Sequence, residues 1–269
     1  PQRLDVGDYT TFALCRNGWT IYNRLDVFVG NCLRRYGEYS YEEQELFESM
    51  LGPDDVVIEA GAHIGAHTIA ISRKVSKVYA FEPQRLAFQM LCGNLALGEC
   101  RNVFAYQMAL GDHNGSVFVP HEIPGVVGNM GGVILNGVTE GEKVPMVAID
   151  SLSINCQFIK ADVEEMEYEV LIGARQTIKR CRPVMYLESN NNHKRLIDLL
   201  TELEYAAHWH LPFMFSEDNF YENKEDAMAN TRSLNLLCLP FGHPAAARFA
   251  AGRISSDNIG VTITKKGVA

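Results

Sequence analysis

Hydrophobic residues follow a strand-like pattern over the first part of the chain. β-Branched and aromatic residues dominate three short segments, 9–14, 18–23 and 26–33. Segments of this length and composition are typical of β-strands. Asn17-Gly18 lies between the first two segments, and this dipeptide is a signal for a tight hairpin turn. The beginning of the chain is therefore predicted to be a small β-structure.

A helix is predicted to follow this β-structure. Ser40 is a good N-cap residue, and Glu43 three residues later completes a capping-box pattern. The apolar residues that come next share one helical face: Leu46, Phe47, Met50 and Leu51. Gly52-Pro53 then predicts the end of the helix.

From residue 56 onward, strand-like and helix-like segments alternate. The predicted strands are 56–61, 77–83, 102–112, 158–164 and 183–189. The predicted helices are 66–75, 86–97, 168–180 and 193–205. Two late segments, 206–211 and 233–241, are expected to close the sheet as an antiparallel pair. The alternation predicts an α/β fold with a mostly parallel sheet and helices on both of its faces.

One stretch interrupts this alternation. Residues 113–149 are rich in glycine and are predicted to form an extra hairpin or a loop insert. A loop of this length inside a domain usually carries function. We therefore expect an N-terminal extension (1–52), a core domain (53–242) with the insert, and a C-terminal tail (243–269).

Composition narrows the class of protein. The hydrophobic share of 47% excludes a disordered chain, and no apolar run is long enough to cross a membrane. The 24 Lys and Arg residues against 33 Asp and Glu residues give a net charge of −9, which argues against a nucleic-acid partner. Seven scattered cysteines without a CxxC pair favour free thiols and a cytoplasmic location. A small-molecule partner is favoured, and a homo-oligomer stays open. Because the chain begins at Pro1, we expect it to be trimmed, processed or part of a longer polypeptide.

The turn after the strand at 56–61 indicates the kind of ligand. Ligands of open parallel sheets lie beyond the carboxyl ends of the strands. Gly61 and Gly65 favour a tight turn with close backbone approach. A dinucleotide site requires G-x-G-x-x-G, but His63 occupies the middle glycine position. The turn therefore suits a ligand with adenosine and no pyrophosphate.

Two acids refine this ligand. Glu82 closes the second core strand, where an acid accepts both ribose hydroxyls of an adenosine. Glu59 precedes the glycine turn and is placed to hold an ammonium group. S-Adenosylmethionine carries an adenosine, an ammonium and a carboxylate, so it matches these residues better than NAD does. Thr68, on the first turn of the next helix, is expected to donate to the carboxylate of such a ligand.

Two separate motifs resemble one family. The segments VVIEAGAHIGAHTIAIS, VYAFEPQ, NLAL and ALGD, followed by FIKADVEEMEYEVLIGA and RPVMYLE, are similar to the FkbM family of S-adenosylmethionine-dependent methyltransferases. The resemblance covers about residues 37–240 and has both motifs in the family's order. It implies a class I methyltransferase fold, which is a Rossmann-like, seven-stranded sheet whose last strand is antiparallel. It also implies O-methylation, with sugar and natural-product hydroxyls as the leading acceptors.

The sequence departs from the family pattern at three positions. Glu59 replaces the usual Asp and keeps its charge, whereas His63 replaces the usual Asn. Glu165 replaces the glycine of the second motif, which affects the turn after the fourth core strand. By analogy with the family, Ala109 and Asp112 are expected beside the adenine, although Asp112 also fits a plain turn.

The catalytic candidates are mainly acids. Asp162 ends the fourth core strand, is expected to face the cofactor, and is followed by Glu164 and Glu167. Neighbouring carboxylates repel one another, so at least one pKa is expected to rise and make a general base for an alcohol. The alternative is an acidic helix N-terminus that favours the helix dipole. His193 is the best histidine candidate for a base.

Five residues are predicted to contact the substrate. The family resemblance suggests a site-lining role for Asn129 and Gly131 in the insert, while Glu188, Asn190 and Asn219 are chosen by their position after strands or in a late loop. Asp162 with Glu188 also gives an oxygen-rich alternative for a divalent metal, although we expect no metal.

Three functions are therefore carried forward. The first is an S-adenosylmethionine-dependent O-methyltransferase acting on a sugar or hydroxylated natural product. The second is an NAD-dependent oxidoreductase, which His63 disfavours. The third is a binding module that keeps the cofactor pocket without transferring a methyl group.

Overall fold

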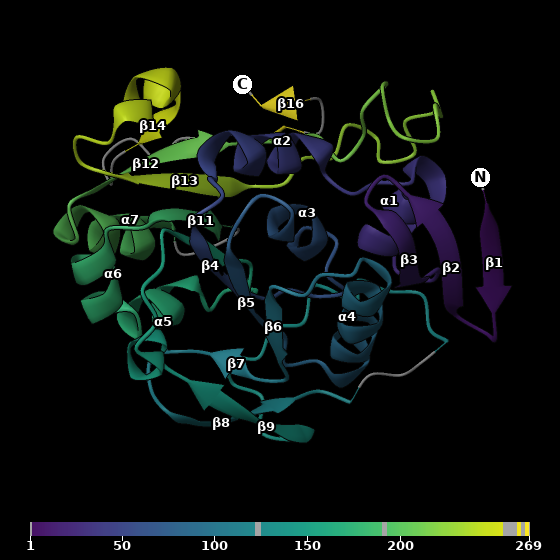
Figure 1. Ribbon diagram of the computed structural model, residues 1–269, viewed down its shortest axis with the longest axis horizontal. Helices are drawn as coiled ribbons and strands as arrows, with labels where there is room; N and C mark the ends of the chain where they lie inside the picture. Colours follow the sequence, from purple (N-terminus) through teal and green to yellow (C-terminus); the bar gives the residue numbers. More distant parts are fainter. Residues whose placement is uncertain (1, 122–124, 190–192, 255–262, 265–266, 269) are drawn as a thin grey trace.

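The computed structural model describes residues 2–121, 125–189, 193–254, 263–264 and 267–268. Its N-terminal part is a small antiparallel sheet at one side of the molecule (Figure 1). Its strands, in the order β1-β2-β3, are β1 (Arg3–Val6), β2 (Thr10–Cys15) and β3 (Gly18–Asn23). The predicted hairpin at Asn17-Gly18 is confirmed, since Cys15 pairs with Gly18 at the end of the β2–β3 ladder.

The predicted strand at 26–33 is wrong, because this segment begins helix α1 (Val29–Tyr36). The Asp26 carboxylate accepts hydrogen bonds from the N–H groups of Phe28 (3.1 Å) and Gly30 (2.9 Å) at the start of the helix. These bonds satisfy donors that a helix leaves without partners. The buried side chains follow a helical spacing that the strand prediction overlooked: Val29, Cys32, Leu33 and Tyr36.

The helix predicted after Ser40 is confirmed as α2 (Tyr41–Met50), but its capping box is wrong. The Ser40 hydroxyl donates to the Glu43 carboxylate (2.7 Å) instead of each side chain bonding the backbone of the other residue. The reason is the left-handed backbone of Ser40, with φ of 41°, where a capping box requires an extended N-cap residue.

The central sheet has the strand order β14-β12-β13-β11-β10-β4-β5-β6. Its main strands are β4 (Val56–Ala60), β5 (Lys77–Phe81), β6 (Val103–Tyr106), β10 (Phe158–Ala161), β11 (Val184–Glu188), β12 (Tyr205–His210) and β13 (Asn235–Pro240). β13 runs antiparallel to both of its neighbours, which confirms the closing pair. One short strand, β14 (Arg253–Ile254), adds to the seven expected, because part of the predicted tail pairs with the outer edge of β12.

Helices cover both faces of this sheet (Figure 1). α2, α3 (Thr68–Ser72) and α4 (Arg85–Leu97) pack on one face, and α5 (Glu167–Ile172), α6 (Arg175–Cys181) and α7 (His193–Glu202) pack on the other. Successive residues of β4 serve the two cores, because Val57 faces the first group and Ile58 the second.

The helix predicted at 168–180 is broken into α5 and α6. A Cβ atom on Gly173 would lie 2.0 Å from the carbonyl oxygen of Gly111, so the chain passes too close to another backbone for a side chain. The predicted helix at 66–75 is also shorter, since only Thr68–Ser72 is helical.

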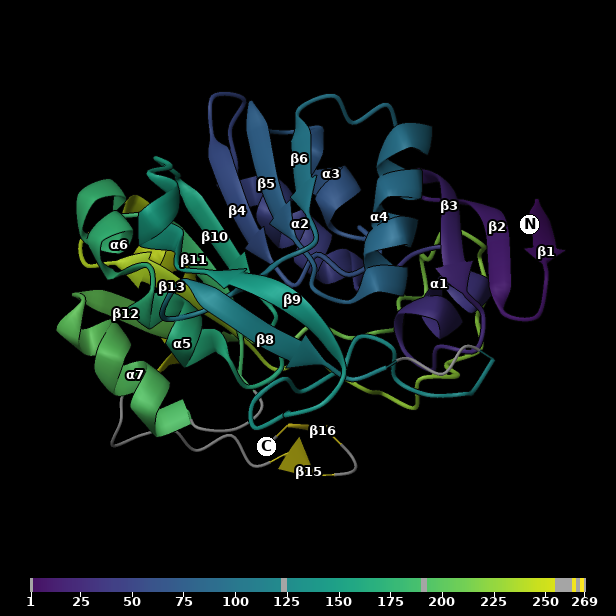
Figure 2. The ribbon, with the colours of Figure 1, turned by 90° about the horizontal axis from the view of Figure 1, so that it is seen from below.

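The insert and the end of the strand predicted at 102–112 together form a second small sheet, in the order β7-β9-β8. Its strands are β7 (Ala109–Leu110), β8 (Gly115–Val119) and β9 (Glu142–Val147), and the antiparallel pair of β8 and β9 agrees with the first of the two predicted alternatives, a hairpin or a loop insert. This sheet runs from the side of α5 toward α1 (Figure 2). A 3₁₀ helix, η1 (Ile149–Leu152), leads back to the core.

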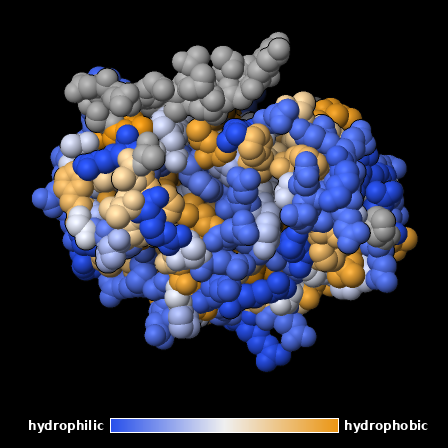
Figure 3. Space-filling model, turned by 90° about the horizontal axis from the view of Figure 1, so that it is seen from above, coloured by the Kyte–Doolittle hydropathy of each residue, from blue (hydrophilic) through white to orange (hydrophobic). Residues whose placement is uncertain are grey.

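The C-terminal part adds the 3₁₀ helix η2 (Pro244–Gly252) and a hairpin of β15 (Ile263–Thr264) and β16 (Gly267–Val268). Polar side chains cover most of the face seen in Figure 3, where apolar residues form small separate groups. Within the ranges that the structure describes, every helix is too short or too polar to cross a bilayer.

Candidate active site

A cavity of about 340 Å³ opens at the carboxyl ends of β4, β5 and β10. This is the position where open parallel sheets bind their ligands. Four parts of the chain line the cavity: the core strand ends, the insert, the N-terminal segment and the segment between β12 and β13. The predicted residues on its wall are Glu59, Gly61, His63, Glu82, Ala109, Asn129, Gly131, Asp162, Glu164 and Glu188.

The glycine turn after β4 presses against the end of β10. Gly61 has φ of +75°, and a Cβ atom there would lie 1.8 Å from the carbonyl oxygen of Asp162. Gly65 has φ of +86°, and a Cβ atom on it would meet Leu91 at 2.8 Å. Only glycine satisfies both the left-handed backbone and the close approach at these positions. Gly65 shapes the turn from behind, because it does not itself line the cavity.

His63 takes a left-handed backbone conformation between these glycines, with φ of 50°. Histidine and asparagine both adopt this region more readily than most residues, so His63 fits this turn at the position where the family usually has Asn. The N–H of His63 donates to the carboxylate of Glu82 (2.7 Å). Burial lowers the pKa of the His63 ring, which lines the cavity in its neutral form.

Glu82 stands at the lip of the cavity just after β5 and is 2% exposed. Its two carboxylate oxygens accept hydrogen bonds from the backbone N–H groups of His63 (2.7 Å) and Gln84 (2.8 Å). These bonds hold the carboxylate in one orientation. A carboxylate oxygen can accept more than one hydrogen bond, so a carboxylate in this orientation is suited to accept hydroxyl donors from a ligand.

A row of charged side chains lies at the floor of the cavity, and Lys160 and Glu59 are the buried members of this row. The Lys160 ammonium is 3.8 Å from Glu59 Oε1 and 3.3 Å from Asp162 Oδ2. Burial alone would lower the pKa of Lys160, but the carboxylates of Asp162, Glu59 and Glu43 together raise it. Burial would likewise raise the pKa of Asp162, and Lys160 outweighs it so that the pKa falls. Lys160 and Asp162 are therefore a charged pair.

Glu59 and Thr68 bond each other. The Thr68 hydroxyl donates to Glu59 Oε2 (2.7 Å), and Thr68 does not line the cavity. Burial raises the pKa of Glu59 in spite of Lys160 and Thr68. The threonine expected to reach a ligand carboxylate instead fixes an acid of the protein.

Glu164 lines the cavity beside Asp162. Burial, and then the charges of Asp162 and Glu165, raise its pKa to about 7. Glu164 and Glu165 have φ of 48° and 73°, so the left-handed turn persists although Glu165 replaces the family's glycine. Such strain is held by the surrounding fold and is common at functional sites.

Glu167 stabilises the turn after β10 and does not line the cavity. Its carboxylate accepts the N–H of Val163 (3.0 Å), and its side chain does not line the cavity. Burial raises its pKa to about 7. We therefore regard Glu167 as a residue that positions the Asp162–Glu164 turn.

Three carboxylates gather on one side of the cavity. Asp162, Glu164 and Glu188 each place an oxygen within 4.8 Å of the others, which is a spacing that a divalent cation can bridge. Asp162 is already paired with the Lys160 ammonium, which supplies positive charge to this cluster.

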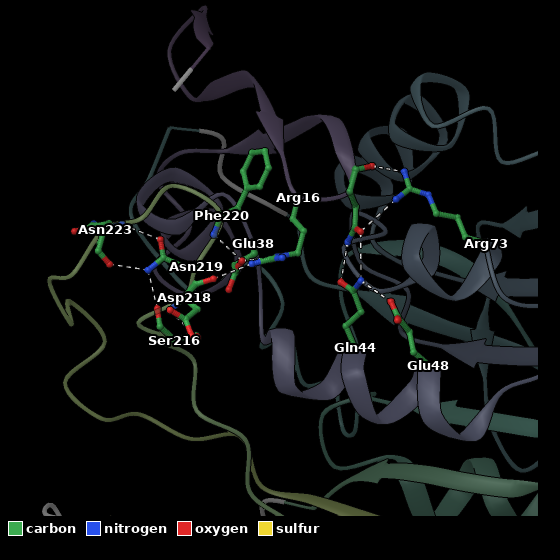
Figure 4. A network of polar contacts seen from close by, with 11 residues as sticks. Arg16, Glu38, Gln44, Glu48, Arg73, Ser216, Asp218, Asn219, Phe220 and Asn223 are labelled. Atoms are coloured by element: carbon green, nitrogen blue, oxygen red, sulfur yellow. Dashed lines mark hydrogen bonds and ion pairs between the residues drawn. The ribbon is translucent and has the colours of Figure 1, made fainter.

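Other predicted residues lie away from the cavity. Asp112 is exposed and pairs with His113 (2.6 Å). The amide of Asn219 is buried, and it bonds the backbone of Ser216 and Asn223 in a network with Arg16 and Glu38 (Figure 4). Asn190 lies outside the described residues, and only the backbone of His193, at the start of α7, is described.

The cavity is also lined by residues that the sequence analysis did not predict. Tyr39 and Glu43 come from the N-terminal segment, and Met214 and residues 231–235 come from the β12–β13 connection. His67 is 5% exposed and also lines the cavity. Burial lowers the pKa of His67 to about 3, so its ring is neutral.

Glu43 is the most informative of these additional lining residues. Its carboxylate accepts the Ser40 hydroxyl (2.7 Å) and the Asn235 amide (3.4 Å), and it is 3% exposed. Burial, against the opposing charge of Lys160, raises its pKa to about 7. A signal was present in the sequence, because Glu43 shares the apolar helical face of Leu46, Phe47 and Met50, where a lone acid is unusual.

The topology defines the class of protein. In the central sheet the reversed strand β13 stands between β11 and β12, which is the arrangement of the class I methyltransferase fold. The classical dinucleotide fold is instead a mostly parallel sheet with the strand order 3-2-1-4-5-6. A model of the methyltransferase FkbM domain matches residues 59–207, more than half of the chain. The chain therefore belongs to the FkbM methyltransferase family, whose cofactor is S-adenosylmethionine.

Solved structures share parts of this architecture. The FkbM methyltransferase of Methylobacillus flagellatus KT is 16% identical, with a TM-score of 0.47 over 78% of this chain and 57% of that one. The tRNA m1G37 methyltransferase of M. jannaschii is 12% identical, with a TM-score of 0.49 over 88% and 56%. TYW2 of M. jannaschii, in complex with AdoMet, is 10% identical, with a TM-score of 0.46 over 87% of each chain. The chain thus spans less than two thirds of the first two proteins. No curated protein matched the sequence.

Proposed function

We propose that this chain is an S-adenosylmethionine-dependent O-methyltransferase that acts on a hydroxyl group of a sugar or a hydroxylated natural product. The observation that carries the proposal is Glu164, a carboxyl group on the cavity wall with a pKa raised to about 7. A carboxyl group with this pKa accepts a proton from an alcohol at neutral pH more readily than an ordinary glutamate.

The residues around the cavity fit the cofactor. Gly61 leaves room where any side chain would strike Asp162, and Glu82 presents an oriented carboxylate for ribose hydroxyls. His63, Ala109 and Asp162 line the same cavity, and we assign them to the cofactor as well. S-Adenosylmethionine, when bound, supplies a methyl group activated on a sulfonium.

The protein's own part in the transfer is positioning and proton acceptance. Asp162 is held ionised by Lys160, 3.3 Å away, and is suited to orient a hydroxyl by accepting its hydrogen bond. Glu164 is suited to take the proton as the new oxygen–carbon bond forms. Glu167 holds the turn through the Val163 N–H, so Asp162 and Glu164 keep their relative placement.

The remaining walls are assigned to the acceptor. Asn129, Gly131 and Glu188 line the cavity with Tyr39 and Glu43, and they offer hydrogen-bond groups suited to hydroxylated molecules. The net charge of −9 and the acids at the cavity favour neutral or cationic small molecules over nucleic acid.

The two alternative functions make different predictions. An NAD-dependent enzyme would bind NAD, whereas the reversed strand and His63 argue against a dinucleotide. A binding module would bind S-adenosylhomocysteine without transferring a methyl group to any acceptor class.

Calorimetric titration tests the cofactor. We expect S-adenosylhomocysteine to bind in the micromolar range and NAD not to bind. Glu82→Ala should weaken binding by about 1–3 kcal/mol, because ribose hydroxyls lose their acceptor. Glu140→Ala, at an exposed glutamate of the insert, is the matched control and should leave the dissociation constant unchanged. Equal affinity in the two variants would exclude the ribose contact.

A transfer assay tests the base. A panel of glycosides and hydroxylated aromatic compounds is incubated with S-adenosylmethionine, and S-adenosylhomocysteine is measured with and without acceptor. For wild type, kcat should rise as the pH passes through about 7, where Glu164 ionises. Glu164→Gln should lower kcat by about 10²–10⁴-fold and remove this rise. Glu165→Gln, next to it but off the cavity wall, should retain kcat and the rise, but the rise should move to lower pH because the charge of Glu165 contributes to the raised pKa of Glu164. An unaltered pH profile in Glu164→Gln would rule out Glu164 as the base.

A further inference from the structure

The outermost N-terminal strand, β1, buries almost nothing of its own. All four of its residues are exposed, although the other two strands of its sheet have buried faces. It lies at the side of the molecule, with β2 as its only strand neighbour in the described part of the chain (Figure 1). An open strand edge is a template for pairing with another chain.

The backbone register tells which groups this edge presents. The N–H of Leu14 donates to the carbonyl of Gln2 (3.0 Å), and Leu4 stands opposite Phe12 in the same ladder. Hydrogen-bonded pairs alternate in an antiparallel ladder, so Leu4 and Val6 turn their backbone groups toward β2. The N–H and C=O groups of Arg3 and Asp5 therefore point outward.

We propose that the chain forms a two-fold symmetric dimer in which β1 pairs antiparallel with β1 of a second copy. Pairing centred on Leu4 joins the outward groups of Arg3 in one copy with those of Asp5 in the other. It also sets the Arg3 side chain opposite the Asp5 carboxylate, twice by symmetry. The neighbouring registers, centred on Arg3 or Asp5, place like charges opposite each other, which is unfavourable. Charge complementarity thus selects a second copy and one register.

The exposed apolar face of the N-terminal sheet also favours pairing with a second copy of the chain. Leu4 is 62% exposed, Val6 50% and Trp19 37%, and Phe12 stacks on Trp19 with ring centres 4.6 Å apart. In the proposed register Leu4 faces its own symmetry mate in a pair without backbone hydrogen bonds, where side chains approach most closely. The two apolar faces then form one strip across a continuous six-stranded sheet. This dimer does not depend on the proposed function.

Sedimentation velocity of the full chain, from low to high micromolar concentration, tests the proposal. We expect a concentration-dependent shift from monomer to dimer. Arg3→Asp should raise the dissociation constant at least about tenfold, because it puts two acids opposite each other at both ends of the pairing. Arg101→Asp, at a highly exposed arginine far along the chain, is the matched control and should leave the dimer unchanged.

Mixing two defective variants gives the sharper result. Arg3→Asp chains carry acids at both positions, and Asp5→Arg chains carry bases at both. Each variant alone should be monomeric, whereas an equal mixture should form a heterodimer, because every facing pair is then opposite in charge. Thermal unfolding followed by circular dichroism checks that each variant is folded. A chain that stays monomeric at all concentrations, or a dimer that neither variant weakens, would overturn the proposal.

Discussion

Burial removes water from the carboxyl groups around the cavity and thereby shifts their pKa values. Glu43, Glu164 and Glu167 all have pKa values raised to about 7, and burial is the largest cause for each of them. Burial would raise the pKa of Asp162 as well, but Lys160 outweighs it. The turn after β10 therefore carries Asp162, which is ionised, close to Glu164, which changes its charge near neutral pH. Residue types alone predicted that the pKa of at least one acid among Asp162, Glu164 and Glu167 would rise, and in the structure it rises for Glu164 and Glu167.

Glu43 gives a prediction for stability at this scale. A carboxyl group whose pKa rises on folding stabilises the fold at low pH, and that stability is lost as the pH rises from 4.5 to about 7. Glu43→Gln cannot ionise, so relative to wild type it should gain up to about 3 kcal/mol over this range. Urea unfolding at a series of pH values measures the difference.

The matched control is Glu45→Gln, at an exposed glutamate of the same helix. Its stability should follow that of wild type across the series. If Glu43→Gln also ran parallel to wild type from pH 4.5 to 7, the raised pKa of Glu43 would be refuted.

At the scale of elements, the segment between β12 and β13 is tied to the N-terminal segment. Arg16 bonds Glu38 (2.6 Å) and the carbonyl of Asp218 (3.0 Å), and the N–H of Phe220 donates to Glu38 (2.9 Å). These contacts join two regions that both lie outside the family match at residues 59–207. Both regions line the cavity, so the predicted domain boundary after residue 52 would divide residues that belong to one site. That boundary stays a prediction.

Asn219 tests this connection. Its side chain bonds the backbone of Ser216 (2.7 Å) and Asn223 (2.6 Å and 3.0 Å) and is 2% exposed. Asn219→Ala should destabilise the fold by about 1–3 kcal/mol, because buried backbone groups lose their partners. The affinity for S-adenosylhomocysteine should stay unchanged, since Asn219 lies off the cavity wall.

Urea unfolding and calorimetric titration measure the two quantities. Glu217→Ala, at an exposed residue of the same loop, serves as the control for both measurements. A loss of cofactor affinity without a loss of stability would place Asn219 in the binding site after all.

At the scale of the whole molecule, charge is distributed unevenly. The chain as a whole has a net charge of −9. At the floor of the cavity, however, the positively charged Lys160 forms ion pairs with both Glu59 and Asp162. A divalent cation among Asp162, Glu164 and Glu188 would stand near this ammonium and be repelled by it.

We therefore expect transfer without a divalent metal. EDTA should leave kcat within about twofold of its value in untreated enzyme, and added Mg²⁺ should have no larger effect. The measurement is the transfer assay after dialysis against EDTA, with and without Mg²⁺. Loss of activity in EDTA that Mg²⁺ restores would instead assign the three carboxylates to a metal.

Local patterns in the sequence determined most of the fold. Alternating apolar periods predicted the parallel strands, the closing antiparallel pair and the helices on both faces, because these patterns follow from the repeat of each element. The glycine turn and the acids at strand ends were also predicted, since parallel strands bring their carboxyl ends to one edge. One prediction failed because the helical spacing of the buried residues in α1 was overlooked, and another failed where a tertiary contact overrode local preference, at the break at Gly173.

Only the tertiary structure decided which residues share the cavity. Tyr39, Glu43 and Met214 come from segments far apart in the chain and outside the family motifs, and their meeting depends on packing over long distances. Packing likewise separated Glu164, on the cavity wall, from Glu167, which bonds the backbone beside it. A residue's type and spacing specify the chemistry it offers, whereas burial and neighbours set its pKa and its access to a ligand. Those two properties arise only when the whole chain is folded.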